Sequence, residues 1–136
     1  MAFLNNLQII MVEIKIKNNS EQFIKRFKDD INKYAKFYED GSGPWWSYES
    51  TWLIDKNDDI SLVSEDYKYS AWFRIYKDNE NVIKFGIIGS TKVKMTVSLY
   101  AHYHSKLSEY LLMYYDDVIE HIDITPKLTK DIDFYG

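Results

Sequence analysis

The sequence predicts an α+β fold, a two-layer sandwich in which two amphipathic helices pack on one face of a mainly antiparallel sheet. Several short segments alternate apolar and polar residues, which is typical of half-buried strands. Two longer segments repeat apolar residues every three or four positions, as amphipathic helices do. The strands follow one another with short connections, which favours antiparallel pairing. At 136 residues the chain is long enough for one domain core, so we assign residues 1–136 to a single domain.

The first strand and the first helix have the clearest patterns. Residues 10–17 carry Ile or Val at every even position and mostly polar residues between them. Asn19 then offers a side chain that can cap a helix. Apolar residues recur at spacings of three and four from Ile24 to Tyr38, and a Gly-Ser-Gly-Pro sequence follows residue 40. These signals predict a strand and a surface helix.

The remaining elements complete the order β-α-β-β-β-β-α. We expect strands at 48–54, 67–76, 82–88 and 92–104, and then a helix from Ser105 that ends before Pro126. The stretch from Lys92 to His104 has the longest period-two pattern in the chain, with Val93, Met95, Val97, Leu99, Ala101 and Tyr103 on one side. This strand is central to the functional prediction, because alternation turns its cations and rings outward together.

Composition excludes several function classes. The chain has no Cys, which removes disulfides, Cys-ligated zinc and thiol catalysis. No apolar run approaches the roughly 18 residues of a membrane span, and no basic start precedes an apolar segment as in a secretory signal. We therefore predict a cytoplasmic protein without membrane association. No phosphate loop, GxSxG, HExxH or GxGxxG motif is present, so we predict no cofactor and no metal.

Charge is distributed in blocks, although the net charge is only −4. Residues 67–106 hold seven basic and two acidic residues, whereas 41–66 and 107–136 hold one basic with six acidic and two basic with seven acidic residues. Such blocks create local potentials that attract partners of opposite charge. The acidic segments favour a basic partner.

The candidate binding residues come mainly from the outward side of the predicted sheet. Aromatic residues and cations mixed on an open sheet can stack bases and grip phosphates, and the same residue types form hot spots in protein interfaces. The outward set is Trp72, Arg74, Tyr76, Lys84, Lys94, Tyr100 and His102. Overall acidity and the lack of a nucleic-acid-binding signature favour a protein partner over nucleic acid.

Three further features extend the candidate surface. Trp45 and Trp46 follow a Gly-Pro turn and either close the core or anchor a partner. The carboxylates of Asp116, Asp117 and Glu120 lie beside the apolar stripe of the predicted last helix and supply negative charge. A second stripe on that helix, Leu112, Tyr115 and Ile119, packs against the first helix or serves a homodimer.

An enzymatic alternative rests on His102 and His104. On a strand these imidazoles share one face, and two imidazoles can act as an acid–base pair at neutral pH. With Tyr100, Lys94 and Arg74 they could form the site of a small phosphodiesterase or other hydrolase. Two His ligands are one short of the usual catalytic zinc site, so this hydrolase would be metal-independent or His-dependent.

A calcium-like pattern at residues 55–66 is incomplete. Asp55, Asn57 and Asp59 match the first three ligand positions of an EF-hand loop, but Ile60 occupies the glycine position. We interpret this segment as a solvated acidic loop.

The residues favour a non-enzymatic binding module over an enzyme. We predict a small acidic inhibitor that occludes a partner protein, such as a basic nuclease or a defence effector, in a bacterial toxin–immunity or phage anti-defence system. This setting rests on a class-level analogy. The hydrolase and a nucleic-acid binder that uses the basic sheet face are the alternatives.

Overall fold

The computed structural model describes residues 11–40 and 51–125. Eight elements follow one another in the order β-α-β-β-β-β-α-β. They are β1 (Met11–Ile16), α2 (Ser20–Asp40), β2 (Trp52–Ile54), β3 (Ile60–Leu62), β4 (Ala71–Lys77), β5 (Val82–Gly89), α3 (Val97–Tyr114) and β6 (Ile119–Ile124).

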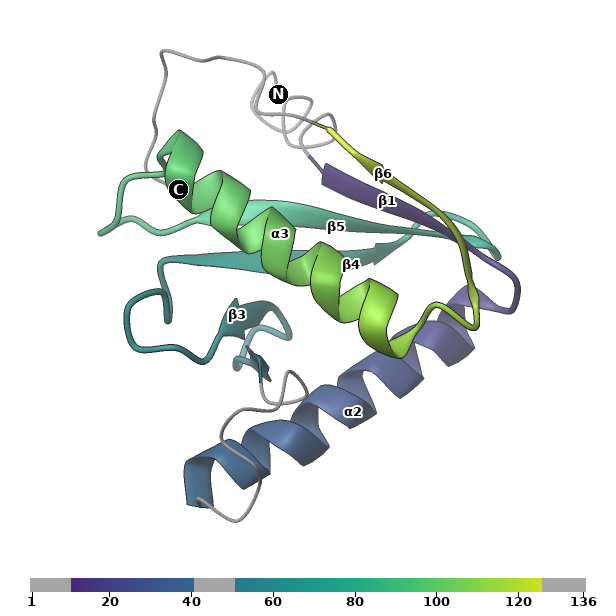
Figure 1. Ribbon diagram of the computed structural model, residues 1–136, viewed down its shortest axis with the longest axis horizontal. Helices are drawn as coiled ribbons and strands as arrows, with labels where there is room; N and C mark the ends of the chain where they lie inside the picture. Colours follow the sequence, from purple (N-terminus) through teal and green to yellow (C-terminus); the bar gives the residue numbers. More distant parts are fainter. Residues whose placement is uncertain (1–10, 41–50, 126–136) are drawn as a thin grey trace.

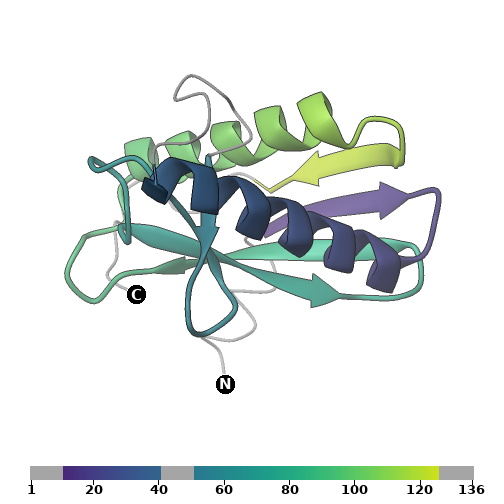
Figure 2. The same ribbon diagram turned by 90° about the horizontal axis from the view of Figure 1, so that it is seen from below.

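The described strands form one antiparallel sheet in the order β2-β3-β4-β5-β1-β6. Both helices lie on the same side of this sheet (Figures 1 and 2). We call the side under the helices the covered face and the opposite side the open face. The predicted fold class, an α+β sandwich with two helices on one face, is confirmed.

The core lies between the helices and the covered face. Alternation places Val12, Ile14 and Ile16 of β1 there, each with 0–1% of its surface exposed. Phe27 of α2 sits above the sheet with its ring centroid 5.5 Å from that of Phe85 on β5. These aromatic and aliphatic contacts hold the layers together, since burial of apolar surface is the main favourable term in folding.

The predicted cap of the first helix is confirmed. Asn19 Oδ1 accepts hydrogen bonds from the backbone N–H groups of Glu21 and Gln22, at 2.8 and 3.3 Å. These bonds satisfy two of the N–H groups that a helix start leaves without an intrahelical partner. The helix then buries Phe23, Phe27 and Ile31. Strand β1 and helix α2 therefore form where the local pattern indicates.

The predicted strand at 92–104 is wrong. Helix α3 begins at Val97, and its N-cap residue Thr96 accepts a hydrogen bond from Leu99 N–H at 3.0 Å. Among the alternating apolar residues, Met95, Leu99 and Tyr103 are buried whereas Val93 and Val97 are 38% and 50% exposed. The buried residues are therefore spaced by four, and this spacing continues through Leu107 and Leu111. Apolar residues spaced by four also fit a period of two, because every multiple of four is a multiple of two. The alternating pattern of residues 92–104 is therefore compatible with a helix as well as with a strand.

The predicted end of the last helix is also wrong. Helix α3 stops at Tyr114, with Tyr115 as its C-cap, and the chain returns as β6 beside β1. The returning segment is rich in β-branched residues, which pack well on a pleated surface. Strand β3 was not predicted either, and the strand expected from residue 67 begins at Ala71. The order of elements therefore gains a final strand.

Candidate binding surface

Side chains of β4 and the turn before it form an aromatic surface on the open face. We define this aromatic surface as Tyr69, Trp72, Arg74 and Tyr76. Trp72, Arg74 and Tyr76 alternate with Ala71 and Phe73, which are completely buried on the covered face. Tyr69 and Tyr76 are 48% and 42% exposed. The strand period therefore brings three of the predicted binding residues together, and the turn adds a fourth aromatic residue.

Tyr69 has a backbone conformation that its residue type disfavours. Its φ angle is +60°, in the left-handed region where bulky residues are rare. Its ring stacks on Trp72, with centroids 6.2 Å apart and planes inclined by 24°. Lys68 Nζ lies 5.3 Å from the centre of the same ring. An exposed tyrosine is thus held in a strained turn so that it lies against Trp72.

A buried hydroxyl network holds this turn. The backbone N–H of Tyr69 donates to Ser61 Oγ at 3.0 Å, and Ser61 Oγ donates to Ala71 O at the same distance. Tyr103 from α3 lies 3.1 Å from Ser61 Oγ, and its hydroxyl donates to Tyr67 O at 2.6 Å. These hydrogen bonds link the turn to β3 and to α3. The strain at Tyr69 can persist because its surroundings fix the backbone.

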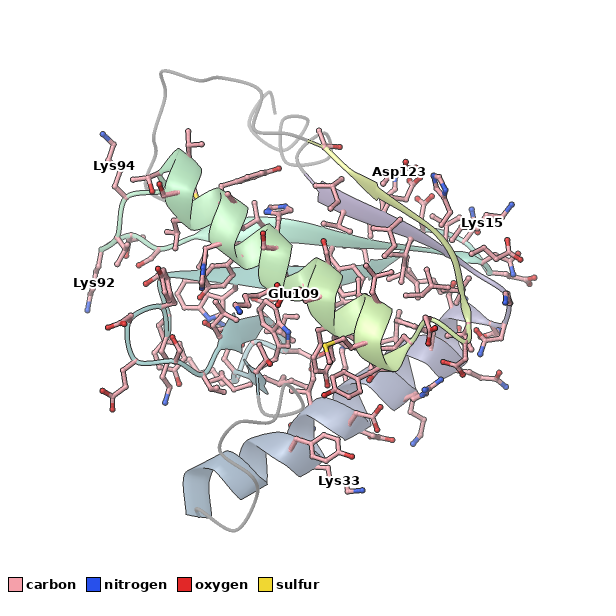
Figure 3. All side chains as sticks on the ribbon, in the orientation of Figure 1. Lys15, Lys33, Lys92, Lys94, Glu109 and Asp123 are labelled. Atoms are coloured by element: carbon pink, nitrogen blue, oxygen red, sulfur yellow. The ribbon has the colours of Figure 1, made fainter. Side chains whose placement is uncertain are left out.

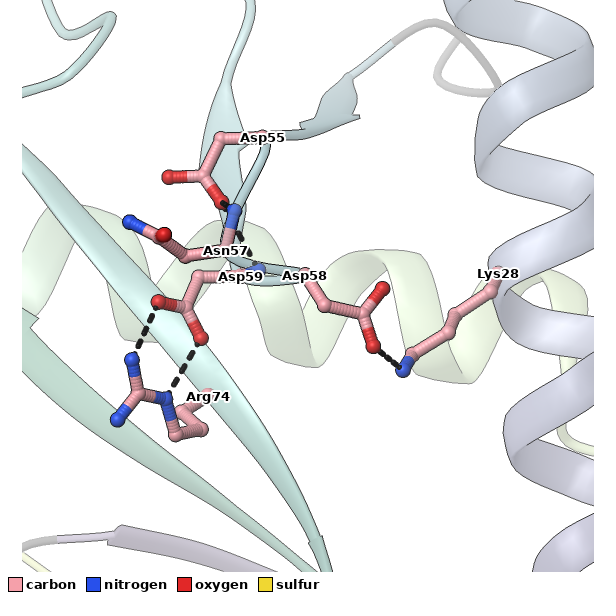
Figure 4. A network of polar contacts seen from close by, with 6 residues as sticks. All are labelled: Lys28, Asp55, Asn57, Asp58, Asp59 and Arg74. Atoms are coloured by element: carbon pink, nitrogen blue, oxygen red, sulfur yellow. Dashed lines mark hydrogen bonds and ion pairs between the residues drawn. The ribbon is translucent and has the colours of Figure 1, made fainter.

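Arg74 is fixed by a buried carboxylate (Figure 4). Its Nε and Nη2 donate to the two oxygens of Asp59 at 2.8 and 2.9 Å. The side chain of Asp59 is 6% exposed and that of Arg74 is 47% exposed. The hydrogen bonds that Arg74 donates to Asp59 raise the pKa of the Arg74 guanidinium above its ordinary value. A paired, two-point contact of this kind restricts the guanidinium to one orientation on the open face.

The loop that carries Asp59 is a compact turn. Asp55 Oδ1 accepts from the backbone N–H groups of Asn57 and Asp59, and Asp58 has a φ of +67°. Lys28 of α2 pairs with Asp58 from the helix side, while Arg74 reaches Asp59 from β4 (Figure 4). This segment was expected to be solvated, and its outer residues are, but Asp59 is buried.

Tyr76 covers a glycine on the neighbouring strand. A Cβ atom added at Gly86 of β5 would lie 3.2 Å from Tyr76 Cε2. The absence of a side chain at Gly86 therefore lets the Tyr76 ring lie close to the sheet. This leaves one side of the ring against the backbone and the other toward solvent.

Ion pairs balance the charge around the aromatic surface. Arg74 pairs with Asp59, as described above. Lys84 Nζ lies 3.8 Å from Glu13 and 3.5 Å from Asp78. Lys77 lies on the covered side of β4 and donates to Glu21 of α2 at 2.8 Å. Two cations of the open face, Arg74 and Lys84, are thus matched by carboxylates, which fits a mixed polar and aromatic protein interface.

Two predicted members of the surface are elsewhere. Lys94 lies in the segment before α3 and points away from the molecule beside the start of the helix (Figure 3). Tyr100 is 5% exposed within α3, and its hydroxyl donates to Thr125 O. Burial raises the pKa of Tyr100 to about 12. Both were placed on the open face only because residues 92–104 were expected to be a strand.

His102 and His104 do not share a face. Two positions on a helix are separated by about 200° of rotation, and the rings have different neighbours. His102 stacks on Tyr67 at 3.8 Å between ring centroids. His104 stacks on Tyr100 at 3.9 Å and is 4% exposed. The predicted side-by-side imidazole pair is therefore not formed.

The two imidazoles also differ in electrostatics. Burial lowers the pKa of His104 to about 4, although its hydrogen bond with Tyr100 O opposes this shift. Burial and the charge of Lys106 lower the pKa of His102 as well. His121, the third histidine, lies on β6 and contacts Asp123. In the described ranges 11–40 and 51–125, no three His, Asp or Glu side chains gather as a metal site would require.

The acidic candidates lie at the turn between α3 and β6. Asp116 and Asp117 are exposed there, and Glu120 is exposed at the start of β6. Arg26 of α2 reaches Asp117 at 3.4 Å and Tyr114 O at 3.1 Å. These carboxylates lie at or after the end of α3, on the turn and on the edge strand β6, and do not join the aromatic surface on β4. Trp45 and Trp46 lie outside the described residues.

Sequence reasoning missed Tyr69 as a member of the aromatic surface and Asp59 as the buried partner of Arg74. Asp59 was assigned to a solvated loop, although it directly precedes the short strand β3. Tyr69 was placed on the inner side of a strand because it alternates with Ala71 and Phe73. Its neighbour Ser70 and the charged residues before it were the available signals for a turn.

Comparisons with family models, with curated proteins and with solved structures found no match. None of the helices in the described part of the chain is both long and apolar enough to cross a bilayer.

Proposed function

We propose that this chain is a non-catalytic binding module that covers a surface of a partner protein through its aromatic surface. The observation that carries the proposal is the strained, exposed Tyr69, which stacks on Trp72 beside the fixed Arg74. Backbone strain costs stability and is concentrated at functional sites. Tyr, Trp and Arg are also the residues most enriched in interface hot spots.

Preorganisation supports a protein partner. The Tyr69–Trp72 stack and the Arg74–Asp59 pair are formed in the single chain, so binding would lose little side-chain entropy. The pairing of Arg74 and Lys84 with carboxylates favours a protein over a nucleic acid, whose binding depends on unpaired cations.

The setting that we propose is inhibition by occlusion. A chain with net charge −4 is attracted to a basic partner, such as a nuclease or another defence effector of the toxin–immunity or anti-defence type. The aromatic surface would supply affinity, and the acidic turn after α3 would increase the rate of encounter.

The test is affinity capture from the native host with the full-length protein as bait. Wild type is expected to retain one protein in stoichiometric amount, and Tyr76→Ala is expected to lose it. Val97→Ala is the matched control, because Val97 is 50% exposed on α3, away from the open face. Equal retention of the protein by wild type and Tyr76→Ala would contradict the proposal.

A second arm addresses nucleic acid. Binding of a short fluorescent single-stranded DNA or RNA is expected to be weak in wild type. Tight binding that falls steeply with salt, and that Tyr76→Ala removes, would replace the protein partner with nucleic acid.

A further inference from the structure

Strand β6 leaves one edge of the sheet unpaired. It has six residues and, in the described part of the chain, pairs only with β1. The strand at the other edge, β2, has three residues. Proteins protect long edges with charged side chains, Pro or bulges. Strand β6 has a bulge at its start and the carboxylates of Glu120 and Asp123, but neither Lys nor Pro occurs between Ile119 and Ile124.

An apolar groove lies beside this edge, between α3 and β6. Leu112 of α3 and Ile124 of β6 line it and are 57% and 45% exposed. Ile119 and Ile122 also line the groove, with Asp116 and Glu120 at its polar part, and it has a volume of about 410 Å³. The unpaired backbone edge and this exposed apolar surface are therefore adjacent.

The residues along the edge fit a second copy of the same edge. On the open face, Lys15 of β1 lies opposite His121, and Glu13 lies opposite Asp123. Within the chain, Lys84 lies 3.8 Å from Glu13, and His121 contacts Asp123 at 2.9 Å. An antiparallel second β6, related by a two-fold axis at Ile122, would set His121 of each copy against Asp123 of the other, so that no two carboxylates face each other across the new contact.

We infer that β6 pairs antiparallel with β6 of a second copy of this chain about a two-fold axis at Ile122. Pairing joins the two sheets through backbone hydrogen bonds. By symmetry, His121 of each copy then lies opposite Asp123 of the other. Leu112 and Ile124 of both copies are covered beside the axis. A self-complementary patch of this kind is what a closed two-fold dimer requires. The aromatic surface is not part of this contact.

The first test is sedimentation equilibrium of the full-length protein over a range of concentrations. Wild type is expected to approach twice the chain mass of 16.3 kDa. Leu112→Glu is expected to weaken self-association by about tenfold or more, because it places a charge in the apolar contact. Met113→Glu is the matched control, because Met113 is 53% exposed on the same helix but does not line the groove. Circular dichroism checks that both variants fold.

The second test exchanges charges at the edge. In the proposed register, a His121→Asp homodimer places carboxylates opposite each other, and an Asp123→His homodimer places imidazoles opposite each other. Each variant alone is expected to dimerise more weakly than wild type. An equimolar mixture restores both opposite pairs, so the mixture is expected to form heterodimers of near wild-type affinity.

Three results would overturn the inference. The first is a wild type that remains monomeric at high concentration, whether its own chain ends or another protein covers the edge. The second is a dimer that Leu112→Glu leaves intact, which would place the contact elsewhere. The third is a mixture of the charge variants that associates no better than either alone, which would exclude this register.

Discussion

The two faces of the sheet use the same aromatic residue types for different purposes. At the covered face, Phe73 of β4 is completely buried, and so are Phe27 of α2 and Tyr103 of α3, which pack in the layer above it. On the open face, Tyr69 and Tyr76 keep nearly half of their surface in solvent. The covered rings contact each other at distances typical of packed aromatic clusters. The open rings lie against Trp72, Gly86 and a fixed arginine. Aromatic content in this chain therefore divides into a part that stabilises the fold and a part available for contact.

This difference predicts opposite responses to mutation. Removing a ring from the covered face leaves a cavity that the neighbours cannot fill. Removing a ring from the open face leaves only solvent.

The largest effect is expected at Phe27. Phe27→Ala should lower the free energy of unfolding by about 3–5 kcal/mol, because it removes a fully buried ring between the layers. Tyr76→Ala should change it by only about 0.5 kcal/mol, as is usual for exposed positions. Urea denaturation measures both values. An equal loss of stability in Tyr76→Ala and Phe27→Ala would contradict the claim that only the buried rings stabilise the fold.

The next largest effect is a pH dependence of the free energy of unfolding that is caused by the buried His104 of α3. The pKa of His104 in the folded chain is about 4, against an ordinary value near 6.5. The unfolded chain therefore binds a proton at a higher pH than the folded chain does. Stability should fall as the pH decreases from 6.5 toward 4, by roughly 3 kcal/mol at most.

A variant at His104 and a control without a titratable group isolate this contribution. His104→Phe should flatten the pH dependence of the urea midpoint over that range, although it costs the hydrogen bond with Tyr100 O. Val97→Ala is the control and should keep the wild-type slope, because Val97 is 50% exposed on the same helix and does not titrate. An unchanged slope in His104→Phe would show that His104 does not carry the effect.

A smaller and asymmetric effect is expected at the ion pair of the open face. Arg74→Met leaves the Asp59 carboxylate buried without its partner and should cost about 2–3 kcal/mol. Asp59→Asn leaves an arginine that is 47% exposed, and should cost about 1 kcal/mol because water can solvate the guanidinium. Thermal or urea unfolding of both variants gives the comparison. Equal losses would mean that the burial of Asp59 does not contribute.

Local signals were sufficient for β1, α2 and the β4–β5 hairpin. In these segments the apolar period and the turn or cap residues agree, as with Asn19 before α2. They were not sufficient for α3, because Met95, Leu99 and Tyr103 fit both periods and only Thr96 marked a helix start. Strand β6 pairs with the distant β1, and a period of three or four through Val118 and Ile122 concealed it.

Only part of the candidate site could be predicted from the sequence, because local patterns do not show contacts between distant residues. Trp72, Arg74 and Tyr76 follow from the alternation of one strand. Asp59 and Tyr69 reach the open face through the hairpin loop before β3 and the strained turn before β4. Tertiary hydrogen bonds to Ser61 and Arg74 fix these positions. Sequence periodicity does not contain that information.

The central claim is that the strain at Tyr69 is retained for contact with a partner. Tyr69 and Asp58 both have a positive φ. Replacing either of them by glycine should relieve backbone strain and raise the free energy of unfolding by up to about 1 kcal/mol. The two replacements, Tyr69→Gly and Asp58→Gly, should then differ in function, because only Tyr69 has its ring on the aromatic surface.

The deciding measurement is the affinity of these two variants for the protein captured by wild type, determined by calorimetric titration. We predict that Asp58→Gly binds like wild type and that Tyr69→Gly loses about tenfold or more in affinity while remaining at least as stable. Unchanged affinity in Tyr69→Gly would contradict the claim that the open face is the contact surface.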